Sequence, residues 1–289
     1  MSNDKPVLCA DDFGLSARTS AGILQLVDRK KLSAVSVMTN LRPECEHLPE
    51  LLQSSSCVSI GVHINLTVGP RAVPAHSQSL NEGHVGLFGA IWRSVGQTWD
   101  KKWLHAEIHR QLEIFEQWAG MTPDHIDGHQ HVHAFPQVSS ILLAVLKERY
   151  RGIQILIRDP APEFHAGVAN MHTGAAKQLL LKGLLAGFGR KIKNAGFLSN
   201  GSFGGYSGFS DTGSYWRELR EAFEKTGAGG IIMCHPGQLD PLVAEFDTVI
   251  KPRSVELDVL LGEKVEDLIF HPERHSQSSR IVWPLELQA

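Results

Sequence analysis

Residues 125–133 read His-Ile-Asp-Gly-His-Gln-His-Val-His, which places four histidines and one aspartate within nine positions. Alternate side chains of an extended strand share one face, so in an extended conformation His129, His131 and His133 could converge on one point. Imidazole is the commonest protein ligand for divalent transition metals. The stretch therefore predicts a strand that ends at a metal site. The alternatives are a histidine-rich surface turn, or one ligand supported by histidines that only donate hydrogen bonds.

Other apolar runs also end in polar residues, and each is a predicted strand: 6–10 before Asp11 and Asp12, 58–66 around His63, and 229–234 before His235. Helical periodicity separates these runs over residues 6–262, as is typical of a parallel sheet that is either closed into a barrel or open. In both architectures the active site lies at the carboxyl ends of the strands. The sequence therefore predicts one shared site formed by Asp11, Asp12, His63, His129 and His235.

Each of these residues also has a simpler explanation. Asp11 and Asp12 could form an Asp-rich turn in which Gly14 supplies an unusual backbone angle. If the chain is still extended there, the two carboxylates point in different directions, which suits one metal ligand and one base. A lone histidine in an apolar strand, such as His63, is more often a core residue, and His235 could be a turn histidine bonded to backbone. Their shared position at strand ends favours the functional interpretation.

The rest of the pattern indicates one domain over residues 1–289, with an insertion at about 67–100 and an extension after about 262. Further strands are predicted at 33–38 and 153–157, and helices at 17–29 (behind a Ser16 cap), 44–53, 103–119, 137–150, 175–194, 214–226 and 253–261. Residues 67–100 lack clear periodicity and are interpreted as a long excursion over the strand ends. The glycines of residues 197–209 lack phosphate-loop spacing and indicate a pocket wall instead.

Two kinds of side chain near these segments have open roles. Trp92, Trp99 and Trp103 could stack on a sugar, although tryptophan more commonly packs in the core. Arg158 follows a predicted strand, where it could orient an acid or contact substrate, or form a solvated or structural ion pair.

Composition excludes several classes of protein. Charged residues make up 20% of the 289 residues and the formal net charge is −3, so no basic surface for nucleic acid or an anionic membrane is indicated. No apolar stretch has the length of a signal peptide or membrane span, and we expect a cytoplasmic protein. The four cysteines lack Cys-x-x-Cys spacing, which predicts neither a disulfide framework nor a thiolate zinc site.

The predicted side chains suit metal-assisted hydrolysis. One carboxylate and two imidazoles can hold a divalent ion and leave positions open for water and a substrate oxygen. A second carboxylate could take a proton from water, and a histidine across the pocket could protonate a leaving group. This layout is typical of the hydrolysis of an amide or ester.

Four ordered motifs resemble those of the YdjC family of carbohydrate deacetylases, also called ChbG/HpnK: Asp11-Asp12-Phe13-Gly14, Gly61-Val62-His63-Ile64-Asn65-Leu66-Thr67, the 125–133 stretch and Cys234-His235-Pro236-Gly237. The resemblance spans about residues 6–262. It implies a distorted (β/α) TIM-like barrel of the glycoside hydrolase/deacetylase type. It also implies the removal of acetyl groups from N-acetylated sugars such as chitooligosaccharides.

Carried over by position, the resemblance implies that Asp12, His63 and His129 hold the metal and that Asp11 is the general base. His235 would be the general acid or a group that orients the substrate. Supporting or substrate contacts are expected from His131, His133 and Arg158.

The resemblance implies magnesium, whereas two nitrogen ligands suit zinc, manganese, iron or cobalt better than a hard ion that prefers oxygen. Segments 67–100 and 161–205 depart from shorter family members, which leaves the sugar open, including a lipid-linked amino sugar. Two other functions stay open: a hydrolase of another bond, such as a phosphoester, and a non-catalytic sugar- or metal-binding protein. Asp11 and His235 argue against a pure binder, which needs neither base nor acid. The resemblance alone suggests a homodimer.

Overall fold

The computed structural model describes residues 5–41, 47–73, 85–161, 182–206, 214–245, 247, 249–273 and 283. Its strands form one eight-stranded parallel sheet in the order β6-β5-β4-β3-β2-β1-β8-β7. The strands are β1 (Val7–Phe13), β2 (Ala34–Val37), β3 (Ser59–Ile64), β4 (His125–Gly128), β5 (Leu156–Ile157), β6 (Leu198–Ser199), β7 (Phe203–Gly204) and β8 (Ile231–Cys234). Among the described residues β6 and β7 are not paired, so the curled sheet is a half-barrel. The predicted distorted barrel is confirmed.

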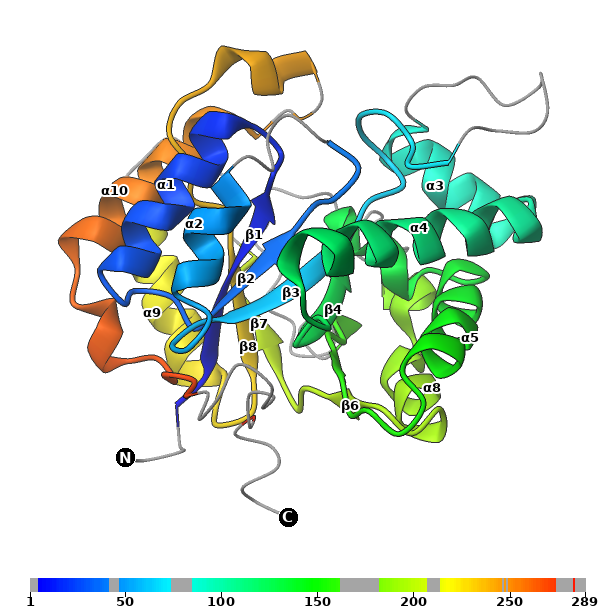
Figure 1. Cartoon of the computed structure of the whole chain (residues 1–289). Helices are drawn as coiled ribbons and strands as arrows, with labels where there is room; N and C mark the ends of the chain where they lie inside the picture. The colour runs from blue at the N-terminus through cyan, green and yellow to red at the C-terminus, as the bar shows by residue number, and fades with distance from the viewer. Residues whose placement is uncertain are drawn as a thin grey trace.

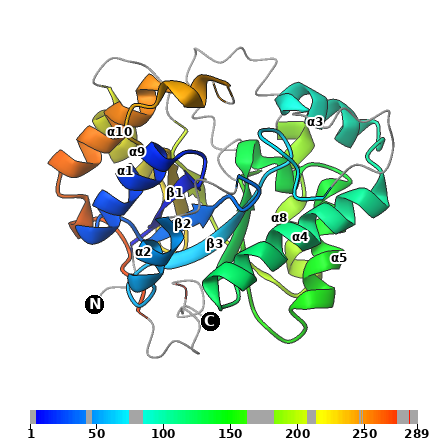
Figure 2. The same ribbon diagram turned by 45° about the horizontal axis from the view of Figure 1, so that its top comes forward.

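Helices form the outer layer of the half-barrel (Figure 1). They are α1 (Ala17–Asp28), α2 (Leu48–Gln53), α3 (Gly86–Val95), α4 (Lys101–Ala119), α5 (Val138–Arg149), α8 (Phe188–Asn194), α9 (Tyr215–Lys225) and α10 (Lys251–Gly262). Figure 2 shows α1, α9 and α10 on one flank and α4, α5 and α8 on the other. No helix in the described part of the chain has the length and apolar character needed to cross a membrane.

Local sequence explains where the helices begin and which face they bury. The predicted cap of α1 is confirmed, because the Ser16 side chain accepts the backbone N–H of Thr19. Asp100 caps α4 in the same way. The helices bury apolar side chains against those of the strands, as Ile23 and Leu112 do with Val35 and Ile60 in one hydrophobic cluster. This packing fixes the strand ends on which the polar residues lie.

Three segments differ from the expectations of the sequence pattern. The helix predicted at 175–194 is interrupted before α8 by Gly187, which has a left-handed φ of 77°, and residues 175–181 lie outside the described residues. Residues 67–100 contain α3, a ten-residue helix that the pattern did not predict. Its buried face holds only Ala90, Ile91 and Ser94, which is too little to give a clear period. Residues 197–209, expected to shape a pocket wall, contribute the strands β6 and β7. Two residues are too few to show an alternating pattern.

A bulge interrupts β1 at its carboxyl end. Ala10 pairs with Val35 and Phe13 pairs with Val37, so β1 carries one extra residue within this interval. Asp12 lies in the interval with a φ of 68°, a left-handed conformation that non-glycine residues seldom adopt. A bulge redirects the side chains of the bulged strand. Consecutive residues Asp11 and Asp12 can therefore both face the barrel interior, which a regular strand does not allow.

Glycine is required at position 61, where β3 passes β4. A Cβ atom built on Gly61 would lie 2.4 Å from the backbone oxygen of His125 and 2.4 Å from its ring. Real Cβ atoms do not approach backbone this closely, so a larger residue would have to push the paired strands apart.

We expect Gly61→Ala to lower the free energy of unfolding by about 1–3 kcal/mol, because overpacking forces backbone shifts. Urea unfolding followed by circular dichroism measures the change. Gly262→Ala is the matched control, since a Cβ there meets nothing within 4 Å and alanine favours the helix. Equal stability of Gly61→Ala and wild type would show that β3 and β4 adjust without strain.

Candidate active site

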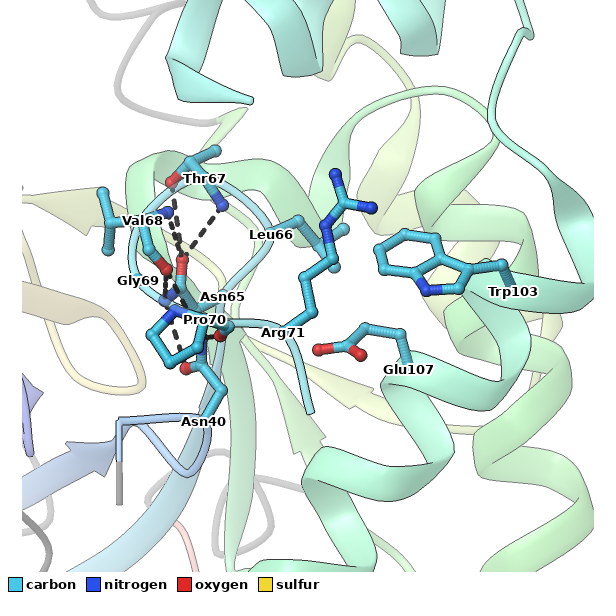
Figure 3. Close-up of a pocket in the computed structure, with 10 residues that line it drawn as sticks. All are labelled: Asn40, Asn65, Leu66, Thr67, Val68, Gly69, Pro70, Arg71, Trp103 and Glu107. Carbon is cyan, nitrogen blue, oxygen red and sulfur yellow. Dashed lines mark hydrogen bonds between the residues drawn. The ribbon is translucent and has the colours of Figure 1, made fainter. Parts of the chain in front are cut away.

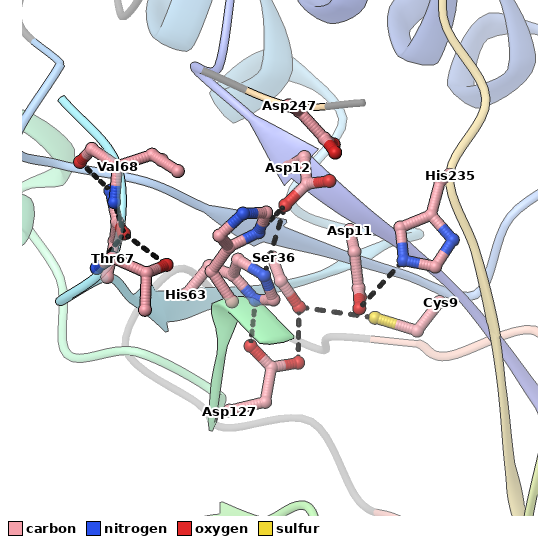
Figure 4. Close-up of polar contacts among 12 residues, drawn as sticks. Cys9, Asp11, Asp12, Ser36, His63, Thr67, Val68, Asp127, His235 and Asp247 are labelled. Atoms are coloured by element: carbon pink, nitrogen blue, oxygen red, sulfur yellow. Dashed lines mark hydrogen bonds and ion pairs between the residues drawn. The ribbon is translucent and has the colours of Figure 1, made fainter. Parts of the chain in front are cut away.

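Three residues predicted to hold a metal lie together at the carboxyl ends of the strands. Asp12 Oδ1 lies 2.8 Å from His129 Nδ1 and 3.2 Å from His63 Nε2. All three side chains are buried, and one ligand atom from each lies within 4.8 Å of the others. Figure 4 shows His63 and Asp12 facing each other across the strand ends. A carboxylate with two imidazoles is a donor set that divalent transition metals accept.

Asp12 is shared between this cluster and an arginine. Arg253 Nη2 donates to Asp12 Oδ2 at 2.7 Å, on the side away from the histidines. Burial disfavours the ionised form of Asp12, but His129 and Arg253 outweigh it and hold the pKa of this carboxyl well below its usual range. Asp12 is therefore an anion at neutral pH, as a metal ligand has to be.

Asp127 orients His63. His63 Nδ1 lies 2.6 Å from Asp127 Oδ1. In the neutral ring this bond keeps the proton on Nδ1 and leaves the Nε2 lone pair facing Asp12. Ser36 donates to the other oxygen of Asp127 at 2.6 Å. Burial disfavours the charged form of His63, yet the carboxylates of Asp127 and Asp11 raise its pKa to about 10.

Sequence reasoning did not assign a role to Asp127, Arg253 or Ser36. Asp127 belongs to the histidine-rich stretch and precedes His129 by two residues, so the alternation along β4 could have pointed to it. Arg253 is far from Asp12 in the chain and lies on a helix, where the sequence carries no comparable signal.

Asp11 lies between an arginine and a histidine. Arg158 makes two bonds to it, Nη1 to Oδ2 and Nη2 to Oδ1, both of 2.6 Å. Arg158 is 1% exposed, so this is a buried ion pair rather than a solvated one. On the other side, His235 Nε2 lies 4.0 Å from Asp11 Oδ2. The structure thus brings both predicted catalytic residues to one point beside the Asp12 cluster (Figure 4).

The prediction that His129, His131 and His133 share one face is wrong. β4 ends at Gly128, and residues 129–134 form a short 3-10 helix in which His131 has a left-handed backbone, with a φ of 59°. This turn separates the three rings. His131 packs edge-on against Phe203, and the Nε2 atom of His133 lies 2.8 Å from the backbone oxygen of residue 158. Of the three, only His129 faces Asp12.

The tryptophans divide between core and surface. Trp99 and Trp103 are buried and stacked, with ring centroids 5.9 Å apart, and the Arg71 guanidinium lies 4.7 Å from the Trp103 ring centroid. The common role of tryptophan in packing therefore applies to both. Trp92, on α3, is 78% exposed.

A small polar pocket follows β3 (Figure 3). Its polar side chains hold the loop itself: Asn65 Oδ1 accepts the backbone N–H groups of residues 67 and 68, and Glu107 accepts those of residues 72 and 73. The lining consists of Asn40, Asn65, Leu66, Thr67, Val68, Gly69, Pro70, Arg71, Trp103 and Glu107. These bonds fix the chain that leaves His63, which makes the pocket a structural support for the site.

The charge of the cluster fits a divalent cation. Four carboxylates, from Asp11, Asp12, Asp127 and Asp247, pair with only two guanidinium groups, those of Arg158 and Arg253, and the protonated His63 ring offsets one of the two remaining negative charges. His129 Nε2 is buried and has no hydrogen-bond partner among the described residues. An excess of negative charge and an unpaired ring nitrogen are both expected at a cation site.

Two other groups of potential ligands are less suitable. Asp11, His63 and Asp127 lie close together, as do Cys9, His125 and Asp127. Arg158 occupies both oxygens of Asp11, lies 2.5 Å from Asp127 Oδ2 and lies 3.1 Å from the Cys9 sulfur. Arg253, in contrast, takes only Oδ2 of Asp12 and leaves Oδ1 to the histidines. The Asp12–His63–His129 cluster is the better metal site.

Comparison with known proteins gives three findings. The family model described as YdjC-like protein matches residues 6–270. Proteins named chitooligosaccharide deacetylase from Yersinia pestis (strain Pestoides F) and Yersinia pseudotuberculosis (serotype O:1b, strain IP 31758) are each 24% identical over 265 residues, which is 91% of this chain and 93% of theirs. The crystal structure of a putative cellobiose-phosphate cleavage protein from Enterococcus faecalis V583 is similar in fold, with a TM-score of 0.67 and 19% identity over 92% of this chain and 94% of that one.

The buried His125 gives a test by pH. Its Nε2 and Nδ1 atoms lie 3.0 and 2.9 Å from the hydroxyls of Ser36 and Ser59, and burial, aided by Arg158, lowers its pKa to about 4. The unfolded chain binds this proton near pH 6.5 and the folded protein only near pH 4. The free energy of unfolding should therefore fall by about 1–2 kcal/mol from this group alone as the pH decreases from 6.5 to 5.

Urea unfolding at the two pH values measures this loss. We expect His125→Asn to lose less stability than wild type on acidification, and His105→Asn to match wild type, because the His105 side chain is 39% exposed. The same loss in His125→Asn and wild type would contradict the assignment.

Proposed function

Because the chain belongs to the YdjC-like family, we propose that it is a metal-dependent hydrolase that removes the acetyl group from an N-acetylated sugar, either a chitooligosaccharide or a lipid-linked amino sugar. The names of its Yersinia relatives support a carbohydrate deacetylase. The observation that carries the proposal is the position of Asp11 and His235, side by side, next to the Asp12–His63–His129 cluster.

The metal would be held by Asp12, His63 and His129. A divalent ion bound there would polarise the acetyl carbonyl and lower the pKa of water. The two imidazoles favour zinc, manganese or cobalt over magnesium, which prefers oxygen ligands. Asp127 would keep the His63 ring in the orientation that presents Nε2.

Asp11 would act as the general base. Its two oxygens are fixed by the Arg158 guanidinium, so the carboxylate cannot turn away from the site. It would accept a proton from the attacking water as the water oxygen bonds to the acetyl carbon. Arg158 would act by holding Asp11 in place.

His235 would act as the general acid. Its side chain is 16% exposed and faces Asp11 Oδ2, so it borders both the base and the solvent side of the site. When the carbon–nitrogen bond of the amide breaks, His235 would donate a proton to the leaving nitrogen. The products are acetate and a free amino sugar.

Acetate release from diacetylchitobiose tests this function. We expect metal-stripped protein to be inactive, and zinc, manganese or cobalt to restore activity more fully than magnesium. Asp11→Asn should lower kcat by about 10²- to 10⁴-fold, the usual contribution of a general base, without loss of metal binding. Asp258→Asn is the matched control, since this aspartate is exposed on α10.

Two outcomes would contradict the proposal. Release of phosphate from phosphorylated sugars without release of acetate from any acetylated sugar would indicate hydrolysis of a different bond. Normal sugar binding by Asp11→Asn, with no product formed by wild type, would indicate a binding protein.

A further inference from the structure

We propose that the start of α10 is a positioning element, with Arg253 as the residue that sets the metal-binding geometry of Asp12 and with Glu256 fixing the turn that carries His235. The inference rests on the proposed function, because it concerns the same metal and acid groups. It assigns a role to two buried charged residues that make no direct contribution to the proposed chemistry.

The two oxygens of Asp12 have different partners. Arg253 Nη2 donates to Oδ2 at 2.7 Å, while Oδ1 faces His63 and His129. Asp12 can then offer one oxygen to a metal. With two imidazoles this gives three protein ligands and leaves the remaining positions for water and substrate, as a catalytic site requires.

The guanidinium is itself held in place from two further directions. The same Nη2 atom lies 2.6 Å from Asp247 Oδ2, and Nε donates to the backbone oxygen of Val249 at 2.8 Å. Arg253 is 2% exposed. A planar guanidinium held by several bonds has one orientation. The nitrogen that pairs with Asp12 Oδ2 is therefore fixed in place.

The left-handed backbone of Asp12 gives such a contact a second role. Its φ of 68° lies in a region that residues with a side chain adopt only occasionally, aspartate among them. Residues in strained conformations keep them only where surrounding contacts hold them. The bond from Arg253 is such a contact, and it acts on the side chain of the strained residue.

The same helix fixes His235. The Arg253 backbone oxygen accepts the N–H of Gly237 at 3.1 Å, and Glu256 Oε2 accepts the N–H of His235 at 2.6 Å. Glu256 is buried and follows Arg253 by almost one helical turn. One helix therefore contacts both Asp12, near the end of β1, and His235, directly after β8, and these two strands are neighbours in the sheet.

A cobalt titration of metal-stripped protein tests the role of Arg253. We expect Arg253→Met to raise the Kd for Co²⁺ by about 10- to 100-fold, the usual cost of removing a residue that orients a metal ligand. The visible absorption band of bound Co²⁺ should also change, because its shape reports coordination geometry. Arg253→Lys keeps the positive charge but not the planar guanidinium. Its Kd for Co²⁺ should lie between those of wild type and Arg253→Met. Arg149→Met is the matched control, since Arg149 is partly buried and pairs with Glu116.

The direction of the change separates positioning from simple charge. If Arg253 acted only as a nearby positive charge, its removal would make Co²⁺ bind more tightly, and that result would overturn the inference. An unchanged Kd and spectrum would overturn it too. Failure of wild type to bind Co²⁺ would instead reject the metal site and with it the proposed function.

The variant Asp247→Asn gives a second test of the role of Arg253, which can be used if Arg253→Met does not fold. It leaves the Asp12–Arg253 bond available but removes the second anchor, and we expect Co²⁺ to bind several-fold more weakly. Wild-type affinity in this variant would count against the inference.

The Glu256 contact has its own test. Glu256→Ala should lower kcat for acetate release by about 10- to 100-fold through displacement of His235, with the Kd for Co²⁺ unchanged. Glu256→Gln keeps an oxygen that can accept the His235 N–H and should restore most of the rate. Equal rates in Glu256→Ala and wild type would overturn this part of the inference.

Discussion

Two buried guanidinium groups neutralise carboxylates in the interior of this half-barrel. Arg158 lies between Asp11 and Asp127, and Arg253 lies between Asp12 and Asp247. Each carboxylate would cost several kcal/mol to bury alone, and the loss of one partner from a buried pair typically costs about 3–5 kcal/mol. Because each arginine serves two carboxylates, four acidic groups can share a small volume. The placement of the strand ends depends on these contacts.

The two arginines also divide the site into two halves. Arg158 holds the carboxylate proposed as the base, and Arg253 holds the carboxylate proposed as a metal ligand. The residues that carry these carboxylates are adjacent in sequence, and the bulge in β1 is what brings both of them to the barrel interior, where each meets its own arginine. The separation of a proton-accepting group from a metal-binding group thus begins in the backbone of one strand.

Much of the fold and part of the site could be predicted from the sequence. Apolar runs that end in polar residues placed Asp11, Asp12, His63, His129 and His235 at one edge of a parallel sheet, because strand direction is the same throughout such a fold. Alternation could not predict the left-handed turn after β4, which directs His131 and His133 elsewhere. Nor could it connect Arg253 with Asp12, since contacts across the fold leave no periodic signal. The two-residue strands β6 and β7 show no alternation that predicts a strand, whereas β5 lies within the strand predicted at 153–157.

The strands of the half-barrel fall into a long group and a short group. Strands β8, β1, β2, β3 and β4 have four to seven residues each and carry or directly precede all five residues proposed for metal binding and catalysis. Strands β5, β6 and β7 have two residues each, and β6 and β7 are not paired with each other in the part of the chain that the structure describes. The spacing of the proposed reacting groups is therefore set by the part of the sheet in which backbone pairing is most extensive.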